Sequence, residues 1–169
     1  MTSAKSGGEG DDIRSMQCGG SCHSDPALNA TSAATISIEQ PSSNWAGLLT
    51  TVTVNITDFP ESETRIVGVF LLINDQGAKD TPQYDGWTIV ADPNGGVVNY
   101  IETRVANGED SISVTWTLKA PNSAGSYDLL ASIQHGGSGN SASIHGNSLP
   151  ISFEILEPPE DLPRLASDF

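Results

Sequence analysis

A two-residue alternation of apolar and polar side chains is the feature that most constrains the fold of this chain. The segment LLTTVTVNIT (48–57) alternates cleanly and places Val52, Val54 and Ile56 on one face. The same period recurs in four further segments: 35–39, 111–118, 126–134 and 149–156. The run IVGVFLLIN (66–74) is more continuously apolar, as in a central strand. Because side chains of a strand alternate between its two faces, these segments predict strands that each bury one face.

Turn-forming residues separate these segments. Asp92-Pro-Asn-Gly-Gly96 lies between 87–90 and 97–103, and this pattern predicts a β-hairpin. The chain therefore contains about eight predicted strands, and no segment has a convincing helical period. Two sheets must pack together to bury one face of each strand, so we expect an all-β fold. The expected architecture is an antiparallel, immunoglobulin-like β-sandwich with Greek-key connections.

Composition divides the chain into three parts. Residues 1–34 are rich in Gly, Ser, Ala and Asp and read as an N-terminal arm, and 35–156 form the predicted β-sandwich. Residues 157–169 contain three prolines and have no period, which predicts a C-terminal tail.

The charge of the chain argues against two classes of partner, nucleic acids and anionic membrane surfaces. The chain has 21 acidic and seven basic residues, a formal net charge of −14. Nucleic-acid binding requires clustered Lys and Arg, and anionic membrane surfaces attract basic segments, so neither partner is expected. The sequence contains no apolar run long enough to span a bilayer. Residues 1–15 lack the apolar stretch of a signal peptide, but two sequons, at Asn29 and Asn55, are compatible with export.

The arm carries both cysteines of the chain, in the segment Cys18-Gly-Gly-Ser-Cys22-His23. This segment resembles the attachment site of c-type cytochromes, with three intervening residues in place of the usual two. The resemblance implies one covalent haem c, with Cys18 and Cys22 as thioethers and His23 as the proximal iron ligand. A Cys18–Cys22 disulfide, a zinc site completed by a remote histidine, and a thioredoxin-like redox pair remain alternatives.

A second resemblance concerns the sandwich. The stretches LLTTVTVNITDF, IVGVFLLIND and WTLKAPNSAGSYDLLASIQHGG resemble the choice-of-anchor V family, which is related to Reelin-like domains. Members of that family are exported prokaryotic β-sandwiches that often carry a haem-attachment motif just before the sandwich. The resemblance implies a Reelin-like fold and an extracellular or cell-surface location.

The sixth iron ligand has two candidates. His135 continues the inward period of Tyr127, Leu129, Ala131 and Ile133, so we expect it to leave its strand on the core side. His145 follows in what reads as a turn before the last strand, and the two histidines bracket the loop HGGSGNSASIHG. His135 is the first choice as distal ligand and His145 the second. Copper bound by His135 and His145 is a further alternative.

These observations predict a mono-haem electron carrier and no enzyme activity. Two histidine ligands would fill both axial positions and leave outer-sphere electron transfer to redox partner proteins or to neighbouring copies in a homopolymeric filament. The alternative is a non-redox adhesion or carbohydrate-binding sandwich with a Cys18–Cys22 disulfide. Its aromatic platform would come from four residues: Trp45, Tyr84, Trp87 and Tyr100. The loop acids match no EF-hand spacing and read as solvated turn residues: Asp75, Asp80, Asp85, Asp92 and Asp110.

Overall fold

The structure is a computed structural model that describes residues 30–59, 65–74, 79–106, 108–137 and 140–160. Eleven strands and one short 3₁₀ helix are present in these ranges. The strands are β1 (Ala30–Thr31), β2 (Thr35–Glu39), β3 (Asn44–Trp45), β4 (Leu49–Thr57), β5 (Arg65–Leu72), β6 (Thr88–Ala91), β7 (Tyr100–Val105), β8 (Ile112–Lys119), β9 (Gly125–Gly137), β10 (Asn140–Asn147) and β11 (Ile151–Leu156), and the helix is η2 (Pro82–Asp85).

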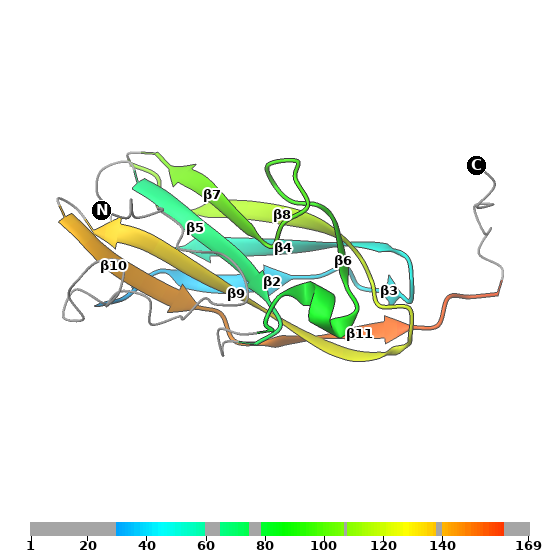
Figure 1. Ribbon diagram of the computed structural model, residues 1–169. Coiled ribbons are helices and arrows are strands. Elements are labelled where there is room, and N and C mark those ends of the chain that lie inside the picture. Colours follow the sequence, from blue (N-terminus) through cyan, green and yellow to red (C-terminus); the bar gives the residue numbers. More distant parts are fainter. Residues whose placement is uncertain (1–29, 60–64, 75–78, 107, 138–139, 161–169) are drawn as a thin grey trace.

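The strands form two packed sheets, which confirms the predicted β-sandwich (Figure 1). The smaller sheet has the order β2-β4-β8-β6. In the larger, seven-stranded sheet, β9 pairs with β5 on one side, and β5 pairs in turn with β7. On its other side β9 pairs with β11 along its first half and with β10 along its second half. The short strands β1 and β3 pair in parallel with β10 and β11, and the remaining pairs are antiparallel.

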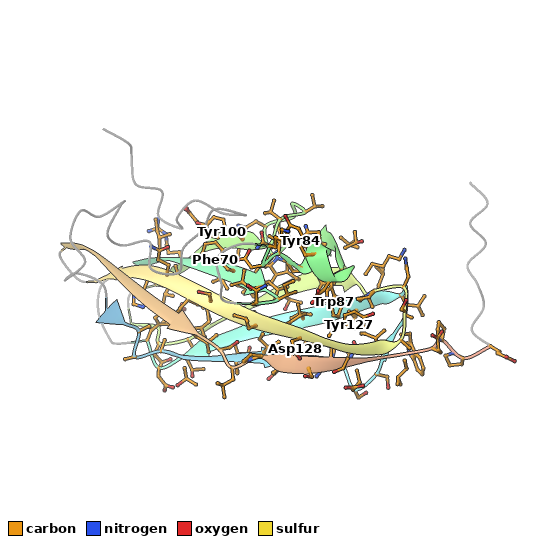
Figure 2. The ribbon with its side chains drawn as sticks, turned by 60° about the horizontal axis from the view of Figure 1, so that its bottom comes forward. Phe70, Tyr84, Trp87, Tyr100, Tyr127 and Asp128 are labelled. Atoms are coloured by element: carbon orange, nitrogen blue, oxygen red, sulfur yellow. The ribbon has the colours of Figure 1, made fainter. Side chains whose placement is uncertain are left out.

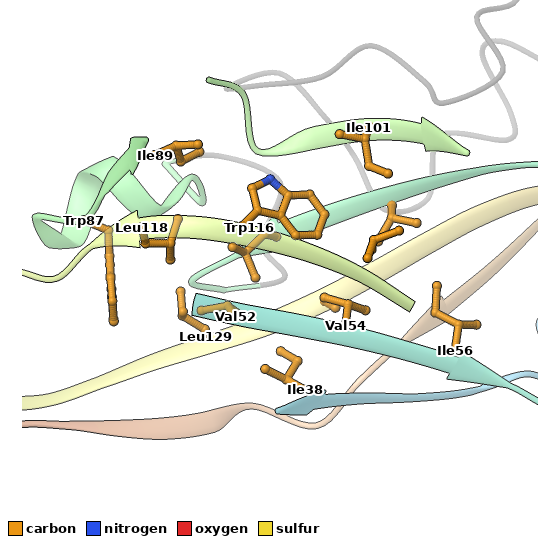
Figure 3. Packing of buried hydrophobic residues seen from close by; sticks show 14 of the residues in the cluster. Ile38, Val52, Val54, Ile56, Trp87, Ile89, Ile101, Trp116, Leu118 and Leu129 are labelled. Atoms are coloured by element: carbon orange, nitrogen blue, oxygen red, sulfur yellow. The ribbon is translucent and has the colours of Figure 1, made fainter. Parts of the chain in front are cut away.

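The predicted apolar faces meet between the two sheets (Figure 3). Val52, Val54 and Ile56 of β4 are fully buried, because the period of two turns each of them toward the seven-stranded sheet. The core-facing residues of β8 and β9 pack against them; they are Val114, Trp116, Leu118, Leu129, Ala131 and Ile133. Figure 3 shows the indole of Trp116 within this cluster. The alternation therefore predicted the core correctly.

The predicted hairpin around 92–96 is wrong. β6 pairs with β8 in the four-stranded sheet, whereas β7 pairs with β5 in the other sheet, so the loop crosses between the sheets. The Asp92 carboxylate organises this loop, because it accepts hydrogen bonds from the backbone N–H groups of Asn94, Gly96 and Val98. The Trp116 indole then donates to the carbonyl of Val98 at 3.0 Å. A turn signal shows that the chain turns, but not which sheet it enters next.

Candidate functional site

The predicted haem-attachment residues Cys18, Cys22 and His23 lie outside the described residues. The described chain begins at β1, seven residues after His23. β1 pairs in parallel with β10, with Ala30 opposite Ile144 and Thr31 opposite His145. The last residues of the predicted arm therefore belong to the seven-stranded sheet, and the arm enters the fold beside β10.

His135 lies near the end of β9, on its core face, as the alternation predicted. The residue is 2% exposed, and the strand continues beyond it to Gly137. The ring meets Phe59, the buried residue that follows β4, edge to face at a centroid distance of 5.6 Å. His135 Nε2 shares a hydrogen bond of 2.9 Å with the hydroxyl of Ser32, just after β1. The histidine thus connects the entry point of the arm to the core.

This environment bears on whether His135 fits the role of an iron ligand. An axial imidazole presents one ring nitrogen to the metal. In this structure Nε2 is engaged with Ser32, and the ring is enclosed next to Phe59. Ligation through Nε2 would require the arm to release Ser32 and the edge of the core to open. The described arrangement fits a residue that fixes the arm better than it fits a ligand.

His145 lies in a strand, so the predicted turn at this residue is wrong. β9 and β10 form a β-hairpin, in which His135 is opposite Ile144 and His145 is opposite Gln134. Directly opposite residues of an antiparallel pair share one face of the sheet. Backbone position 145 therefore belongs with Gln134 to the outer face, turned away from the four-stranded sheet. The glycines and serines of this segment gave no strand signal from which β10 could have been predicted.

The outer face of the seven-stranded sheet contains a feature that the sequence did not predict. A small apolar cluster of Phe70, Leu72 and Leu130 is buried there, separate from the main core, and Tyr100 packs on it. The rings of Phe70 and Tyr100 are 4.6 Å apart, and Figure 2 shows them next to each other. The nearly continuous apolar run of 66–74 was the signal for this cluster, because a strand buried on both faces loses its alternation.

The four aromatic residues of the alternative platform do not lie on one surface. Trp87 is in the core, where it meets Phe153 edge to face at 5.6 Å. Trp45 is half-buried in β3, and Tyr84 is half-exposed in η2. Tyr100 packs on the outer cluster. The structure therefore does not assemble the predicted binding platform.

Two of the five loop acids are buried, contrary to the prediction that all are solvated. Asp80 is fully buried, and Asp92 is 5% exposed because it holds the crossing loop. Asp85 and Asp110 are exposed as expected, and Asp75 lies outside the described residues. In the part of the chain that the structure describes, no group of three or more His, Cys, Asp or Glu residues is placed to hold a metal ion.

No family model and no curated protein matches the chain. Among solved structures, native alpha-2-macroglobulin from Escherichia coli, from domain MG7 to the C-terminus, matches with a TM-score of 0.51 at 10% identity. The match covers 75% of this chain but only 17% of that one. The CARDB domain of the PF1109 protein from Pyrococcus furiosus, solved with di-metal ions, has a TM-score of 0.43 at 10% identity, over 76% and 96% of the two chains. At these identities the likeness concerns the fold alone, a β-sandwich.

Among the residues that the structure describes, no helix is long and apolar enough to cross a bilayer.

Proposed function

We propose that this protein is an extracellular mono-haem c-type cytochrome that carries electrons by outer-sphere transfer. The observation that carries the proposal is the position of the Cys-Gly-Gly-Ser-Cys-His motif, whose histidine precedes Ser32 by nine residues. The chain that follows the motif is fixed at Ser32, which is hydrogen-bonded to the buried His135. The resemblance to haem-bearing choice-of-anchor V sandwiches supports the same assignment.

Three residues of the motif have a role in this proposal. Cys18 and Cys22 hold the porphyrin edge as thioethers, and His23 is the proximal ligand. The haem supplies one-electron chemistry when it is bound, and the distal ligand is His135 or His145. The chain itself contributes a net charge of −14, which favours the more positive, ferric state of a nearby iron.

Covalent attachment suits a protein that works outside the cell, where a dissociated cofactor would be lost. Two histidines of the chain would hold the iron and leave no position for a substrate at the metal, so we assign the protein outer-sphere electron transfer and no enzyme activity. Its partners are then redox proteins or neighbouring copies of the same chain. A homopolymer that stacks such subunits would form a filament with a row of haems.

The test is the intact mass and visible spectrum of the full chain, produced in a host that matures c-type cytochromes. We expect a mass increase of one haem, and a Soret band that shifts on reduction and survives acid-acetone extraction. The double variant Cys18→Ala/Cys22→Ala should lose both signals. A colourless protein whose mass is lower by two hydrogens would contradict the proposal and favour the disulfide-bearing, non-redox sandwich.

A further inference from the structure

A sequon lies within β4, and electron transfer gives it no role. Asn55, Ile56 and Thr57 form the pattern Asn-x-Thr, the acceptor motif for N-linked glycans. Because successive side chains of a strand point to opposite faces, Asn55 and Thr57 share one face and Ile56 belongs to the other. Ile56 is fully buried in the core. The two functional side chains of the sequon therefore project from the outer face of the four-stranded sheet.

The outer face around Asn55 is lined by short hydroxyl side chains. The residues directly opposite Asn55 are Ser37 in β2 and Ser113 in β8, and both are exposed. The neighbouring rows on this face contain one acid, Glu39, and four threonines: Thr35, Thr53, Thr57 and Thr115. A sugar attached to Asn55 would lie over hydroxyl groups that can donate and accept hydrogen bonds.

The amide of Asn55 is held by its oxygen atom. Asn55 is half-buried, and its Oδ1 accepts a hydrogen bond from the hydroxyl of Ser113 across the β4–β8 pair. This contact uses the acceptor of the side chain and leaves Nδ2, the atom to which N-linked glycans are attached. Thr57, two residues further on, is exposed. A glycan on Nδ2 is thus compatible with the folded sheet.

Asparagine is an uncommon choice for this position. Threonine is enriched in strands and asparagine is depleted, and three other outward residues of β4 are threonines: Thr51, Thr53 and Thr57. The sheet does not require an amide here, because Thr53 makes the equivalent cross-strand hydrogen bond with the hydroxyl of Thr115 at 2.9 Å, one row away. Modification of the amide would account for asparagine where threonine would serve the sheet as well.

We propose that Asn55 is an N-glycosylation site whose glycan covers the outer face of the four-stranded sheet. This inference rests on the extracellular location in the proposed function. The donor is a lipid-linked oligosaccharide diphosphate. Nδ2 of Asn55 forms a bond to the anomeric carbon of the sugar, the bond from that carbon to the diphosphate oxygen breaks, and the lipid diphosphate leaves. The amide proton passes to the transferase.

The position of β4 also bears on the timing and on the effect of the glycan. β4 is paired on both sides, with β2 and with β8, so the transfer takes place before the sheet closes. A bulky, hydrophilic glycan on this face then keeps other molecules from packing on it. Copies in a homopolymer would have to associate through their sheet edges or through the seven-stranded sheet.

The test is a peptide map of the full chain from its native source, made with a protease that cleaves after glutamate. Cleavage after Glu39 and Glu61 releases residues 40–61, which contain Asn55 but not the second sequon, at Asn29. We expect this peptide to be heavier by at least one saccharide. Peptide N-glycosidase should remove the added mass and leave aspartate at position 55. A peptide of unmodified mass would overturn the inference.

Variants secreted from a host that glycosylates exported proteins test the role of the sequon. Thr57→Ala and Thr57→Ser are a matched pair, because both keep Asn55 and only serine keeps the sequon. The glycan should be lost in Thr57→Ala and in Asn55→Gln. It should be kept in Thr57→Ser and in Thr51→Ala, a control at an exposed position of the same face. A glycan on Asn55 that persists in Thr57→Ala would contradict transfer to the sequon.

The same map separates the two proposals. The mass of residues 10–39, which contain the Cys-Gly-Gly-Ser-Cys-His motif, decides whether haem is attached. The mass of residues 40–61 decides whether Asn55 is modified, and both readings are of covalent structure and do not depend on the stability of a variant.

Discussion

The two faces of β9 differ at the end of the sandwich where the arm enters. On the core face, Ile133 and His135 are buried because a second sheet lies opposite them. On the outer face, Ser132 and Gln134 are equally buried although a sandwich provides no third layer. The second sheet accounts for burial on the core face, whereas on the outer face other residues of the chain itself cover these polar side chains. This difference indicates that the core face, with its large apolar cluster, contributes more to the stability of the fold than the outer face does.

The largest effect on stability should come from the core face. Ile133→Ala removes most of a fully buried side chain, and such truncations lower the free energy of unfolding by about 2–5 kcal/mol. Urea titration measures this loss. Thr51→Ala, at an exposed position of β4, is the matched control and should change stability by less than about 0.5 kcal/mol. At urea concentrations below its unfolding transition, Ile133→Ala should have the same haem spectrum as the parent. A change in the spectrum would show that the core face also affects the iron ligands.

The loop that crosses between the sheets depends on one carboxylate. Asp92→Ala leaves three backbone N–H groups without their acceptor, so we expect a loss of about 1–3 kcal/mol in the free energy of unfolding. Asp85→Ala, at an exposed position, is the control. If the two variants have the same urea midpoint, Asp92 does not organise the crossing between the sheets.

The hydrogen bond that fixes the arm should have a smaller effect. Ser32→Ala removes the partner of His135 Nε2, and we expect a loss of about 0.5–1.5 kcal/mol by urea titration. Ser37→Ala, at an exposed position of β2, should be neutral. A Ser32→Ala protein as stable as the control would show that the arm is not anchored through His135.

The smallest effect concerns pH and the outer face. Burial, together with the hydrogen bond and negative charge of Glu102, raises the pKa of Tyr100 above its ordinary value. A raised pKa means that the unfolded state releases this proton first. The contribution of Tyr100 to stability is therefore complete below the unfolded pKa, near 10, and declines as pH rises beyond it.

Urea midpoints at about pH 9 and about pH 11 measure this decline. We expect it to be smaller in Tyr100→Phe than in the parent, with Tyr84→Phe, at a half-exposed position, as the control. An identical decline in the parent and in Tyr100→Phe would show that the outer cluster does not shield the phenol.

The sequence predicted the core well and the candidate site only in part. The alternation of β4, β8, β9 and β11 identified their buried residues, and the same period placed His135 on the core side. Strand β10 was not predicted, because Gly, Ser and Asn dominate it and its pairing with β9 is a tertiary property. The burial of Ser132 and Gln134 could not be predicted either, because the residues next to a polar residue in the sequence do not show what covers it in the fold.

Our central proposal is a covalent haem whose sixth iron ligand is His145 and not His135, because Nε2 of His135 is engaged with Ser32. The most direct measurement is the visible and electron paramagnetic resonance spectrum of two matched variants of the haem-loaded chain, His145→Gln and His135→Gln. We predict that His145→Gln converts a six-coordinate, low-spin iron to high spin and that added imidazole restores the low-spin signal, whereas His135→Gln remains low-spin. The reverse result, or a low-spin iron in both variants, would contradict the account.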